Sequence, residues 1–354
     1  MKTLNLMCPI NVTGYGYASV NILFELAKQN LVSLFPINPN NMEADIKYHN
    51  TVQNCLNNSH LFDVHSPTLR IFHQFSMAES IGRGPRIGLP IFELDKFNNI
   101  EKHHLRSLDK IWSCSKWAAN VIKKEIGIDS PVIPLGVDNN IFKPTPIPKN
   151  NKTIFFNAGK WEKRKHDIIL ETFCQAFRQD DNVELWMMCD NIVKPDENIK
   201  WQTQYKSSVL SSKIRFIPRK ETQQALYEVM KYTHFGFFPS HAEGWNLELL
   251  EMMSCGKMCI ATNYSAHTEY CNNDNCKLID VNNVELAYDN IWFHGQGNWA
   301  KFDKNTIEQT VSLLRECYKQ HQSEEDIYNY NGVITGEKLT WENTAKKIIN
   351  NLYI

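Results

Sequence analysis

The sequence lacks both a strong charge imbalance and a long hydrophobic run. Its 38 Lys and Arg residues against 39 Asp and Glu residues give a net charge of −1 at pH 7. This balance gives no whole-protein reason to bind nucleic acid or an anionic membrane. No apolar stretch approaches the roughly 20 residues that span a bilayer, and the start has no signal-peptide pattern. These absences predict a cytoplasmic protein, with peripheral association with a membrane left open.

Paired C-x-x-C motifs are also absent, although the chain has ten cysteines. Several cysteines, including Cys8, Cys189 and Cys259, lie inside apolar runs, where a free thiol behaves as a small hydrophobic side chain. This distribution favours a reducing compartment over a disulfide framework.

The 354 residues are enough for two domains, and a content of 42% hydrophobic residues predicts a packed protein. The proline-rich segment 143–152 is typical of an interdomain linker. The predicted division is therefore 1–145, 146–335 and a closing amphipathic helix within 336–354. The Asn-rich segment 38–60 is expected to be irregular, and so is the segment 289–304.

Residues 235–262 form the most informative stretch. The apolar run 235–239 predicts a buried strand, 247–254 a helix that ends at Cys255-Gly256, and 258–262 the next strand. A strand, a turn, a helix and a strand in this order are the repeating unit of a doubly wound parallel sheet.

Two carboxylates stand out in this unit. Glu243 lies in the turn at the carboxyl end of the strand, and Glu251 lies eight positions later, in the helix. The backbone amides of 244–247 would open the helix and provide an anion site between them. Carboxylates beside amides suit a ligand with hydroxyls and phosphate, such as a sugar nucleotide. The alternative is an ordinary first-turn acid followed by a solvated Glu.

The pattern Glu243-x7-Glu251, preceded by Pro-Ser and followed by Cys-Gly, resembles the E-x7-E signature of retaining GT-B glycosyltransferases of the family-four type. The resemblance implies an α/β fold of two Rossmann-like, doubly wound domains facing across a cleft. It also implies that Glu251 binds the ribose hydroxyls and Glu243 the transferred sugar. The same turn supplies the other implied donor-binding residues of the second domain: Gly244, Trp245, Asn246 and Leu247.

Two further segments extend the resemblance over much of the chain. Residues 131–138 are similar to the P-x-G-V-D segment at the end of the family's first domain. Residues 341–352 are similar to its closing W-E-x-x-A helix, which crosses back onto the first domain. The resemblance therefore implies a first domain on the acceptor side and a second domain that binds the sugar nucleotide.

A basic run follows the predicted strand 153–158. It holds four cations between Lys160 and Lys165, just before a helix predicted over 167–178. A charge run is usually a solvated turn, but its place between a strand and a helix also suits phosphate. In the resembling family this is G-R-x4-K, whose cations hold the donor diphosphate. Lys160 stands in the place of the Arg, which keeps the charge and loses the bidentate fork, and Lys165 has the family's spacing.

The first domain has its own candidates. Gly14-x-Gly16 follows the first predicted strand and allows either a phosphate contact or a simple tight turn, because the third glycine of a dinucleotide fingerprint is missing. His73 follows the predicted strand 68–72, where it is either a ligand group or a hydrogen-bonded strand-edge residue. Glu93 and Asp95 follow the strand predicted at 87–92, either as acceptor-side groups or as helix-capping acids.

The resemblance implies a retaining transfer of a hexosyl or pentosyl group from a nucleoside diphosphate sugar to a glycan, a lipid or another hydroxyl acceptor. Lys160 and Lys165 would neutralise the departing diphosphate, so neither a metal nor another cofactor is expected. Retention in this family proceeds by front-face attack, and no covalent nucleophile is assigned.

Two other functions remain open. One is sugar transfer to modified bases in DNA, which the 14 cations and 12 acids of residues 1–145 do not favour. The other is a sugar-nucleotide-binding protein without transferase activity. Two departures from the family pattern would allow it: Lys160 stands in place of Arg, and Glu93 stands where many relatives have His. A dehydrogenase is disfavoured because no complete G-x-G-x-x-G follows the first strand.

Overall fold

The computed structural model describes residues 2–40 and 46–352, and the chain divides into two compact units. The first unit combines residues 1–138 with 338–354, and the second covers 139–337. The proline-rich segment 143–152, predicted to be the linker, therefore lies inside the second unit, and the segment predicted as a closing helix is grouped with the first.

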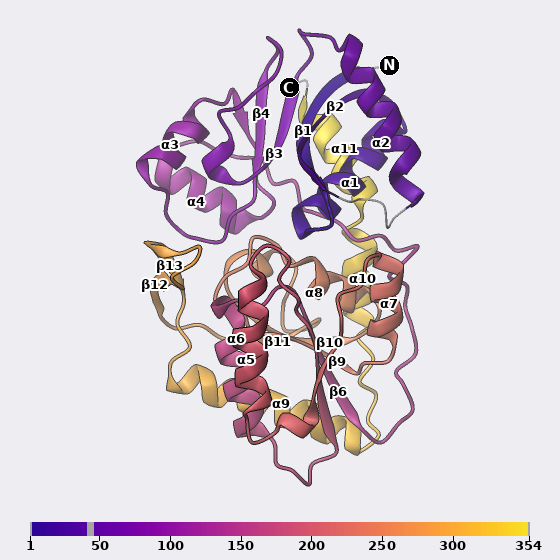
Figure 1. Ribbon diagram of the computed structural model, residues 1–354, viewed down its shortest axis with the longest axis vertical. Coiled ribbons are helices and arrows are strands. Elements are labelled where there is room, and N and C mark those ends of the chain that lie inside the picture. The colour runs from indigo at the N-terminus through magenta and orange to yellow at the C-terminus, as the bar shows by residue number, and fades with distance from the viewer. Residues whose placement is uncertain (1, 41–45, 353–354) are drawn as a thin grey trace. The chain divides into compact units, whose positions relative to one another are not determined.

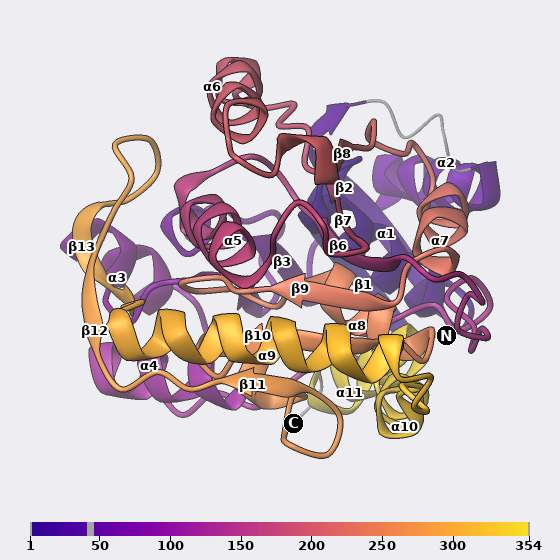
Figure 2. The ribbon, with the colours of Figure 1, turned by 90° about the horizontal axis from the view of Figure 1, so that it is seen from below.

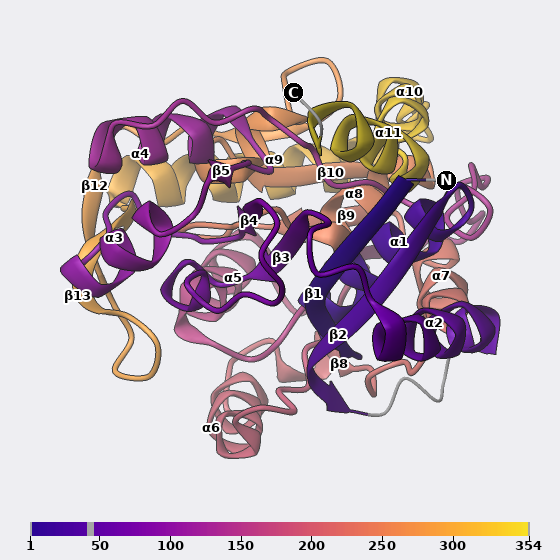
Figure 3. The ribbon, with the colours of Figure 1, turned by 90° about the horizontal axis from the view of Figure 1, so that it is seen from above.

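The first unit is built on a five-stranded parallel sheet with the order β2-β1-β3-β4-β5. Its strands are β1 (Lys2–Asn11), β2 (Asn30–Asn40), β3 (Thr68–Phe72), β4 (Arg86–Pro90) and β5 (Lys110–Ile111). Figure 3 shows β1 and β2 as long neighbouring strands. The chain builds outward from β1 to one side and then resumes at β3 on the other, so the order reverses between β1 and β3.

Five α-helices lie in the described part of the first unit, and Thr13, Asn98 and Ser115 cap the starts of three of them. They are α1 (Gly14–Ala27), α2 (Ile46–Asn58), α3 (Asn99–Arg106), α4 (Lys116–Ile126) and α11 (Trp341–Leu352), with the short 3-10 helices η1 (Ser59–Leu61) and η2 (Gln74–Ser76). Ser115 caps α4 and Gly127 ends it with a φ of 79°, as the sequence predicted. The amphipathic α11 packs on α1, and the Thr344 hydroxyl donates to the Pro134 carbonyl at 2.7 Å.

The second unit contains a six-stranded parallel sheet with the order β11-β10-β9-β6-β7-β8. Its strands are β6 (Thr153–Ala158), β7 (Val183–Met188), β8 (Ile214–Phe216), β9 (Phe235–Phe238), β10 (Met258–Thr262) and β11 (Lys277–Ile279). Figure 1 labels four of these strands, β11, β10, β9 and β6. The chain proceeds from β6 to β8 on one side, then returns to β9 on the other side of β6. The switch point of this doubly wound sheet therefore lies between β6 and β9, which pair directly.

Helices enclose this second sheet. They are α5 (Lys163–Ala176), α6 (Pro195–Lys206), α7 (Gln223–Lys231), α8 (Leu247–Ser254), α9 (Lys304–Gln322) and α10 (Tyr330–Lys338), with the 3-10 helices η3 (Ser211–Lys213) and η4 (Ser265–Glu269). Figure 2 shows α9 running along the sheet, where it packs on α5 and against β6 and β11. The central strands are buried throughout because both of their faces are covered, and Phe155 of β6 stacks on Phe235 of β9 at 5.4 Å between ring centroids.

The expectation of an irregular segment over 38–60 is wrong for most of its described part. Strand β2 extends to Asn40, and α2 occupies 46–58. The Asn-rich composition hid two apolar anchors on one face of this helix, Tyr48 and Cys55, which are both buried. The Tyr48 hydroxyl also donates to the Asn21 side chain at 2.7 Å, so tertiary contacts stabilise a helix of poor formers. Residues 41–45 of this predicted segment lie outside the described part of the chain.

Two other expectations also need correction. Residues predicted to be irregular over 289–304 contain strand β13 (His294–Ala300), which pairs antiparallel with β12 (Val284–Tyr288). Helix α5 starts at Lys163, not Asp167, so the end of the basic run forms its first turn instead of preceding it. Cations are unfavourable at the start of a helix because that end carries the positive pole of the helix dipole. The predicted start was therefore placed after the basic run.

Within residues 2–40 and 46–352, no helix combines the length and the apolar character needed to cross a bilayer.

Candidate functional site in the second unit

The candidate donor site lies at the switch point of the six-stranded sheet. The loop after β6 carries Lys160 and leads to Lys165, and the turn after β9 carries Glu243 and leads to Glu251. Because β6 and β9 are parallel neighbours, their carboxyl ends lie at the same edge of the sheet. Open α/β sheets bind ligands at this position, since the connections on the two sides diverge and leave a crevice.

Lys165 is a buried cation at this edge. Its side chain is 3% exposed, and Nζ donates a hydrogen bond to the Ala158 carbonyl at 3.0 Å. An ammonium group has three donors, so this one contact leaves capacity for oxygens of a ligand. Burying an ammonium group costs free energy unless a negative charge or hydrogen bonds compensate it. A buried, incompletely paired cation is therefore a common feature of anion-binding sites.

Gly159 makes this position of Lys165 possible. Its φ of +118° is a conformation that other residues rarely adopt, and a Cβ there would lie 2.3 Å from Lys165 Nζ. The ammonium group therefore occupies the space that any other side chain at position 159 would need. The glycine at the end of β6 serves both the backbone turn and the placement of the cation.

Lys160 is more exposed than Lys165. Its ammonium lies 3.5 Å from the carboxylate of buried Glu162, and its carbonyl contacts the ring of buried His166 at 3.2 Å. His166 stands where the resembling family usually has glycine, and here its ring packs on Trp161 at 4.4 Å. The side chains of Lys163 and Arg164 lie outside the described part of the structure.

The turn after β9 is fixed by hydrogen bonds. The Ser240 hydroxyl donates to the Glu243 carboxylate at 2.7 Å, and the Glu243 amide donates to Ser265 Oγ at 2.8 Å. Glu243 is 7% exposed, so its carboxylate is oriented by the fold and is not a solvated acid. This arrangement excludes the reading of Glu243 as an ordinary exposed first-turn residue.

Asn246 begins helix α8 in a left-handed conformation, with a φ of 75°. Its side-chain oxygen accepts from the Leu249 amide at 3.2 Å, and its Nδ2 contacts His267 Nε2 at 3.1 Å. The neighbouring Trp245 is buried against Tyr270, whose hydroxyl donates to the Trp245 carbonyl at 2.7 Å. Trp245 and Asn246 therefore shape the turn that presents Gly244 and Leu247 at the start of the helix.

Glu251 lies in α8 and is 5% exposed. Burial raises its pKa well above the ordinary value for glutamate, the nearby charge of Glu248 acts in the same direction, and a hydrogen bond from Gln223 opposes them. Gln223 Nε2 donates to the carboxylate at 3.3 Å. A buried carboxyl group with so few partners favours function over the solvated-helix alternative. Sequence reasoning missed Gln223, whose position at the start of α7 gave no signal.

The candidates of the first unit lie at the carboxyl ends of β1, β3 and β4. A Cβ on Gly16 would lie 1.9 Å from the Asn11 carbonyl oxygen, so this glycine is required for packing α1 against β1, while Gly14 faces open space. The Tyr15 hydroxyl lies 2.8 Å from His73 Nδ1 and donates to the Ile91 carbonyl at 2.8 Å.

Tyr15 therefore links the glycine turn to His73 and to the end of β4, which Glu93 and Asp95 follow. The sequence analysis did not single out Tyr15, although an aromatic residue between two glycines was a signal. The His73 ring is stacked on Phe75 at 4.9 Å between centroids, in keeping with the strand-edge reading and with a ligand role alike.

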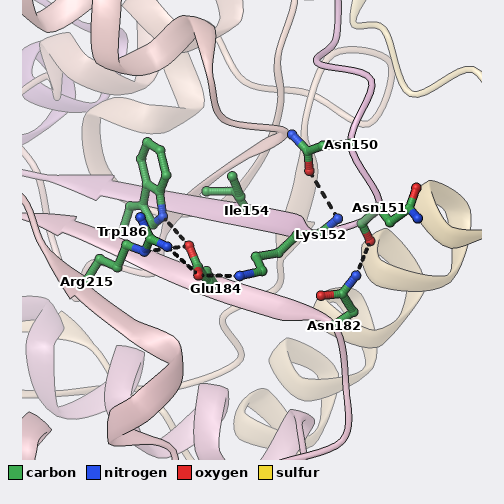
Figure 4. Close-up of a pocket in the computed structure, with 8 residues that line it drawn as sticks. All are labelled: Asn150, Asn151, Lys152, Ile154, Asn182, Glu184, Trp186 and Arg215. Atoms are coloured by element: carbon green, nitrogen blue, oxygen red, sulfur yellow. Dashed lines mark hydrogen bonds and ion pairs between the residues drawn. The ribbon is translucent and has the colours of Figure 1, made fainter.

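A groove of about 530 Å³ lies elsewhere in the second unit, towards the amino ends of β6, β7 and β8 (Figure 4). At its centre the Glu184 carboxylate accepts from Lys152 at 2.6 Å, from Arg215 at 2.8 Å and from the Trp186 indole at 2.8 Å. Burial opposes ionisation of Glu184, but the Lys152 and Trp186 hydrogen bonds and the Arg215 charge hold its pKa below the ordinary value. These groups satisfy one another, which distinguishes the groove from the candidate donor site.

Comparison with known proteins agrees with this architecture. Residues 137–293 match the family model described as glycosyl transferases group 1. The structure of HepE from Anabaena in complex with UDP and glucose is similar with a TM-score of 0.71 at 14% identity, over 99% of both chains. Sucrose-phosphate synthase from Thermosynechococcus elongatus has a TM-score of 0.69 at 12% identity, over 99% of this chain and 98% of that one. No curated protein sequence matches the chain at a significant level.

A glycosyltransferase from Rickettsia africae is also similar, with a TM-score of 0.67 at 13% identity, over 99% of this chain and 97% of that one. The two doubly wound units and these likenesses define the fold as GT-B, as the sequence predicted. The match of residues 137–293, which include β6 to β11, agrees with the resemblance to glycosyltransferases and supports sugar transfer as the activity.

Proposed function

We propose that this protein is a retaining glycosyltransferase that uses a nucleoside diphosphate sugar. One observation carries the proposal: a buried ammonium group and a buried carboxyl group, those of Lys165 and Glu251, follow the two strands that flank the switch point. A cation suits the diphosphate, and a carboxylate suits the ribose hydroxyls. HepE, which shares the fold, has been solved with UDP and glucose.

The proposed mechanism concentrates on the leaving group. As the glycosidic bond breaks, negative charge accumulates on the diphosphate, and Lys160 and Lys165 stabilise it from the loop after β6. Glu243 orients the transferred sugar, and the departing phosphate assists in removing the proton of the acceptor hydroxyl. The start of α8, from Gly244 to Leu247, adds its amide groups to the donor site. Gly14 and Gly16 are proposed as further donor contacts.

We further propose that the acceptor is a glycan, a lipid or another hydroxyl compound, recognised by the first unit through His73, Glu93 and Asp95. The cytoplasm is the proposed location, and the ten cysteines support it because all are free thiols and nine of them are buried. The balanced charge of residues 1–145 does not favour DNA as the acceptor.

Calorimetric titration with UDP, ADP and GDP, followed by turnover of the matching labelled sugar donors, tests the proposal. We expect at least one nucleoside diphosphate to bind and its sugar donor to be consumed. Binding without any consumption of donor, including hydrolysis, would instead identify a non-catalytic sugar-nucleotide-binding protein. Absence of binding to all three would contradict the assigned donor site.

Replacing Glu251 with Ala should weaken nucleoside diphosphate binding by roughly 1.5–3 kcal/mol, because one charge-assisted hydrogen bond to the ribose is lost. The fold should persist, since removing a buried carboxyl group with a raised pKa also removes a desolvation cost. Calorimetry measures the affinity. The control is Glu228→Ala, which removes an exposed acid of α7 that pairs with Lys231 and should leave affinity nearly unchanged. Equal losses in both variants would exclude a specific ribose contact.

Activity should persist in excess EDTA, because two lysines and helix amides supply the positive charge that a divalent cation would otherwise provide. Among the described residues, no three His, Cys, Asp or Glu side chains gather in a way that could hold a metal ion. Donor turnover with and without chelator is the measurement. Loss of turnover in EDTA and its recovery with Mg²⁺ or Mn²⁺ would show that the metal-free proposal is wrong.

A further inference from the structure

The loop at the tip of the β12–β13 hairpin is closed by its own hydrogen bonds. Asp289 is buried, and its carboxylate accepts hydrogen bonds from the backbone amides of Ile291, Trp292 and Phe293 at 2.8, 2.8 and 2.9 Å. Asn290 supplies the left-handed conformation that the turn requires, with a φ of 65°. The loop therefore holds Trp292 in a defined place without help from regular secondary structure.

The other end of the hairpin is tied to the candidate donor site. Trp299 stacks on His241 with ring centroids 4.8 Å apart, and the Ala300 amide donates to the His241 carbonyl at 2.8 Å. The Ala300 carbonyl in turn accepts from His241 Nδ1 at 2.6 Å. His241 lies in the turn after β9, two residues before Glu243. The hairpin is thus a fixed extension of the turn that carries the proposed sugar-binding carboxylate.

Trp292 brings its ring to the cations of the neighbouring loops. Lys160 Nζ lies 5.1 Å from the centre of the indole ring, and Lys194 Nζ lies 5.8 Å from it. These lysines follow β6 and β7, respectively. Indole is the best aromatic partner for an ammonium group, because its face carries the most negative potential. The hairpin therefore adds a cation-binding surface beside the loop that holds the proposed diphosphate cations.

The Trp292 ring lies beside the two lysines although its position leaves one polar group without a hydrogen bond. Its indole N–H is buried and has no hydrogen-bond acceptor among the described residues. Burying such a donor is destabilising, so the N–H does not explain why an indole occupies this position. The face of the ring, which contacts the two ammonium groups, does explain it.

We propose that Trp292 is a positioning residue for Lys160 and that the hairpin is part of the donor site. A lysine side chain has four rotatable bonds, and Glu162 offers its ammonium group a competing partner at 3.5 Å. The indole ring limits the motion of the ammonium group and keeps it available to the diphosphate. This inference rests on the proposed function, because it requires that Lys160 contact the diphosphate.

The test is a double-mutant cycle on the binding of inorganic pyrophosphate, which presents the diphosphate group without base or sugar. Trp292→Ala should weaken pyrophosphate affinity roughly 3- to 30-fold, the range expected for one cation–π contact. Trp292→Phe keeps an aromatic face and removes the orphan N–H, so its affinity should stay within about threefold of wild type. In the Lys160→Ala background, Trp292→Ala should have almost no further effect, because the residue that it positions is gone.

Two controls separate positioning from a general effect on the hairpin. Leu286→Ala removes an exposed side chain of β12 and should leave pyrophosphate affinity unchanged. Lys194→Ala removes the second ammonium group at the ring, and it should weaken binding less than Lys160→Ala. Losses that add in the Trp292→Ala/Lys160→Ala double variant would overturn the inference, and so would equal losses in Leu286→Ala and Trp292→Ala.

The outcomes also separate this inference from the proposed function. If wild type does not bind pyrophosphate, or if Lys160→Ala binds it as wild type does, the diphosphate role of Lys160 is wrong, and the inference falls with it. If Lys160→Ala weakens binding while Trp292→Ala does not, the donor site stands and only the role of Trp292 is overturned.

Discussion

Replacing either Lys160 or Lys165 with Ala should lower the turnover number by roughly a hundredfold or more, the loss expected when one preorganised charge contact is removed. In the proposed mechanism, both ammonium groups would attract the diphosphate more strongly in the transition state than in the bound donor, because charge grows as the sugar leaves. The change should therefore fall mainly on kcat, not on KM. Steady-state kinetics with the donor identified by titration measures both constants.

The structure separates the two lysines. Lys165 is buried and donates to the Ala158 carbonyl, whereas Lys160 is partly exposed and lies 3.5 Å from the Glu162 carboxylate. Lys160→Arg should retain activity if the longer guanidinium side chain fits the site. Lys152→Ala is the matched control for the two Ala variants and should keep wild-type turnover. Lys152 is also a lysine next to a strand end, but it pairs with Glu184 at the amino end of the sheet. Wild-type turnover in both Ala variants would contradict a diphosphate role for the basic run.

Replacing Gly159 with Ala should abolish most of the activity through Lys165. The new Cβ would lie 2.3 Å from Lys165 Nζ, so the ammonium group must leave its position, and the backbone must hold a φ of +118° with a side chain present. Turnover should fall at least as far as in Lys165→Ala. The free energy of unfolding should fall by about 1–3 kcal/mol from backbone strain. Kinetics and denaturant unfolding provide the two measurements.

Gly127→Ala is the matched control for the backbone effect. Gly127 also has a positive φ, of 79°, but a Cβ there would meet nothing within 4 Å. This variant should lose stability and keep turnover. The double variant Gly159→Ala/Lys165→Ala should be no less active than Gly159→Ala alone, because both changes remove the same contact. Normal turnover in folded Gly159→Ala would show that the position of the Lys165 ammonium is irrelevant to catalysis.

Local signals in the sequence were sufficient for most strands and for the central unit. Helix α8 and strand β10 have the predicted bounds, because an apolar run, a polar turn and a Cys-Gly stop each act over a few residues. The same signals placed Glu243 in a turn and Glu251 in a helix. They could not indicate that both carboxyl groups are buried, since burial depends on what packs against the turn from η4 and α7.

Contacts between distant segments decided the rest. Helix α2 forms from an Asn-rich sequence because Tyr48 and Cys55 are buried, and the β12–β13 hairpin is held by Trp299 against His241. Neither contact produces a regular alternation of apolar and polar residues in the sequence. Both segments were therefore predicted to be irregular. Helix α5 begins four residues before the predicted start for a related reason. Lys165, in its first turn, donates to the Ala158 carbonyl at the end of the preceding strand.

The sequence by itself determined the doubly wound units, the glycine turns and the identity of the charged residues at the strand ends, since these follow from local patterns. Only the tertiary structure decided that β6 pairs with β9, which places the connections leading to Lys165 and to Glu251 at one edge of the sheet. It also decided that the hairpin carries Trp292 to Lys160. The order of the strands and the packing of the hairpin against a distant turn depend on contacts between whole surfaces. No short segment of the sequence specifies such contacts.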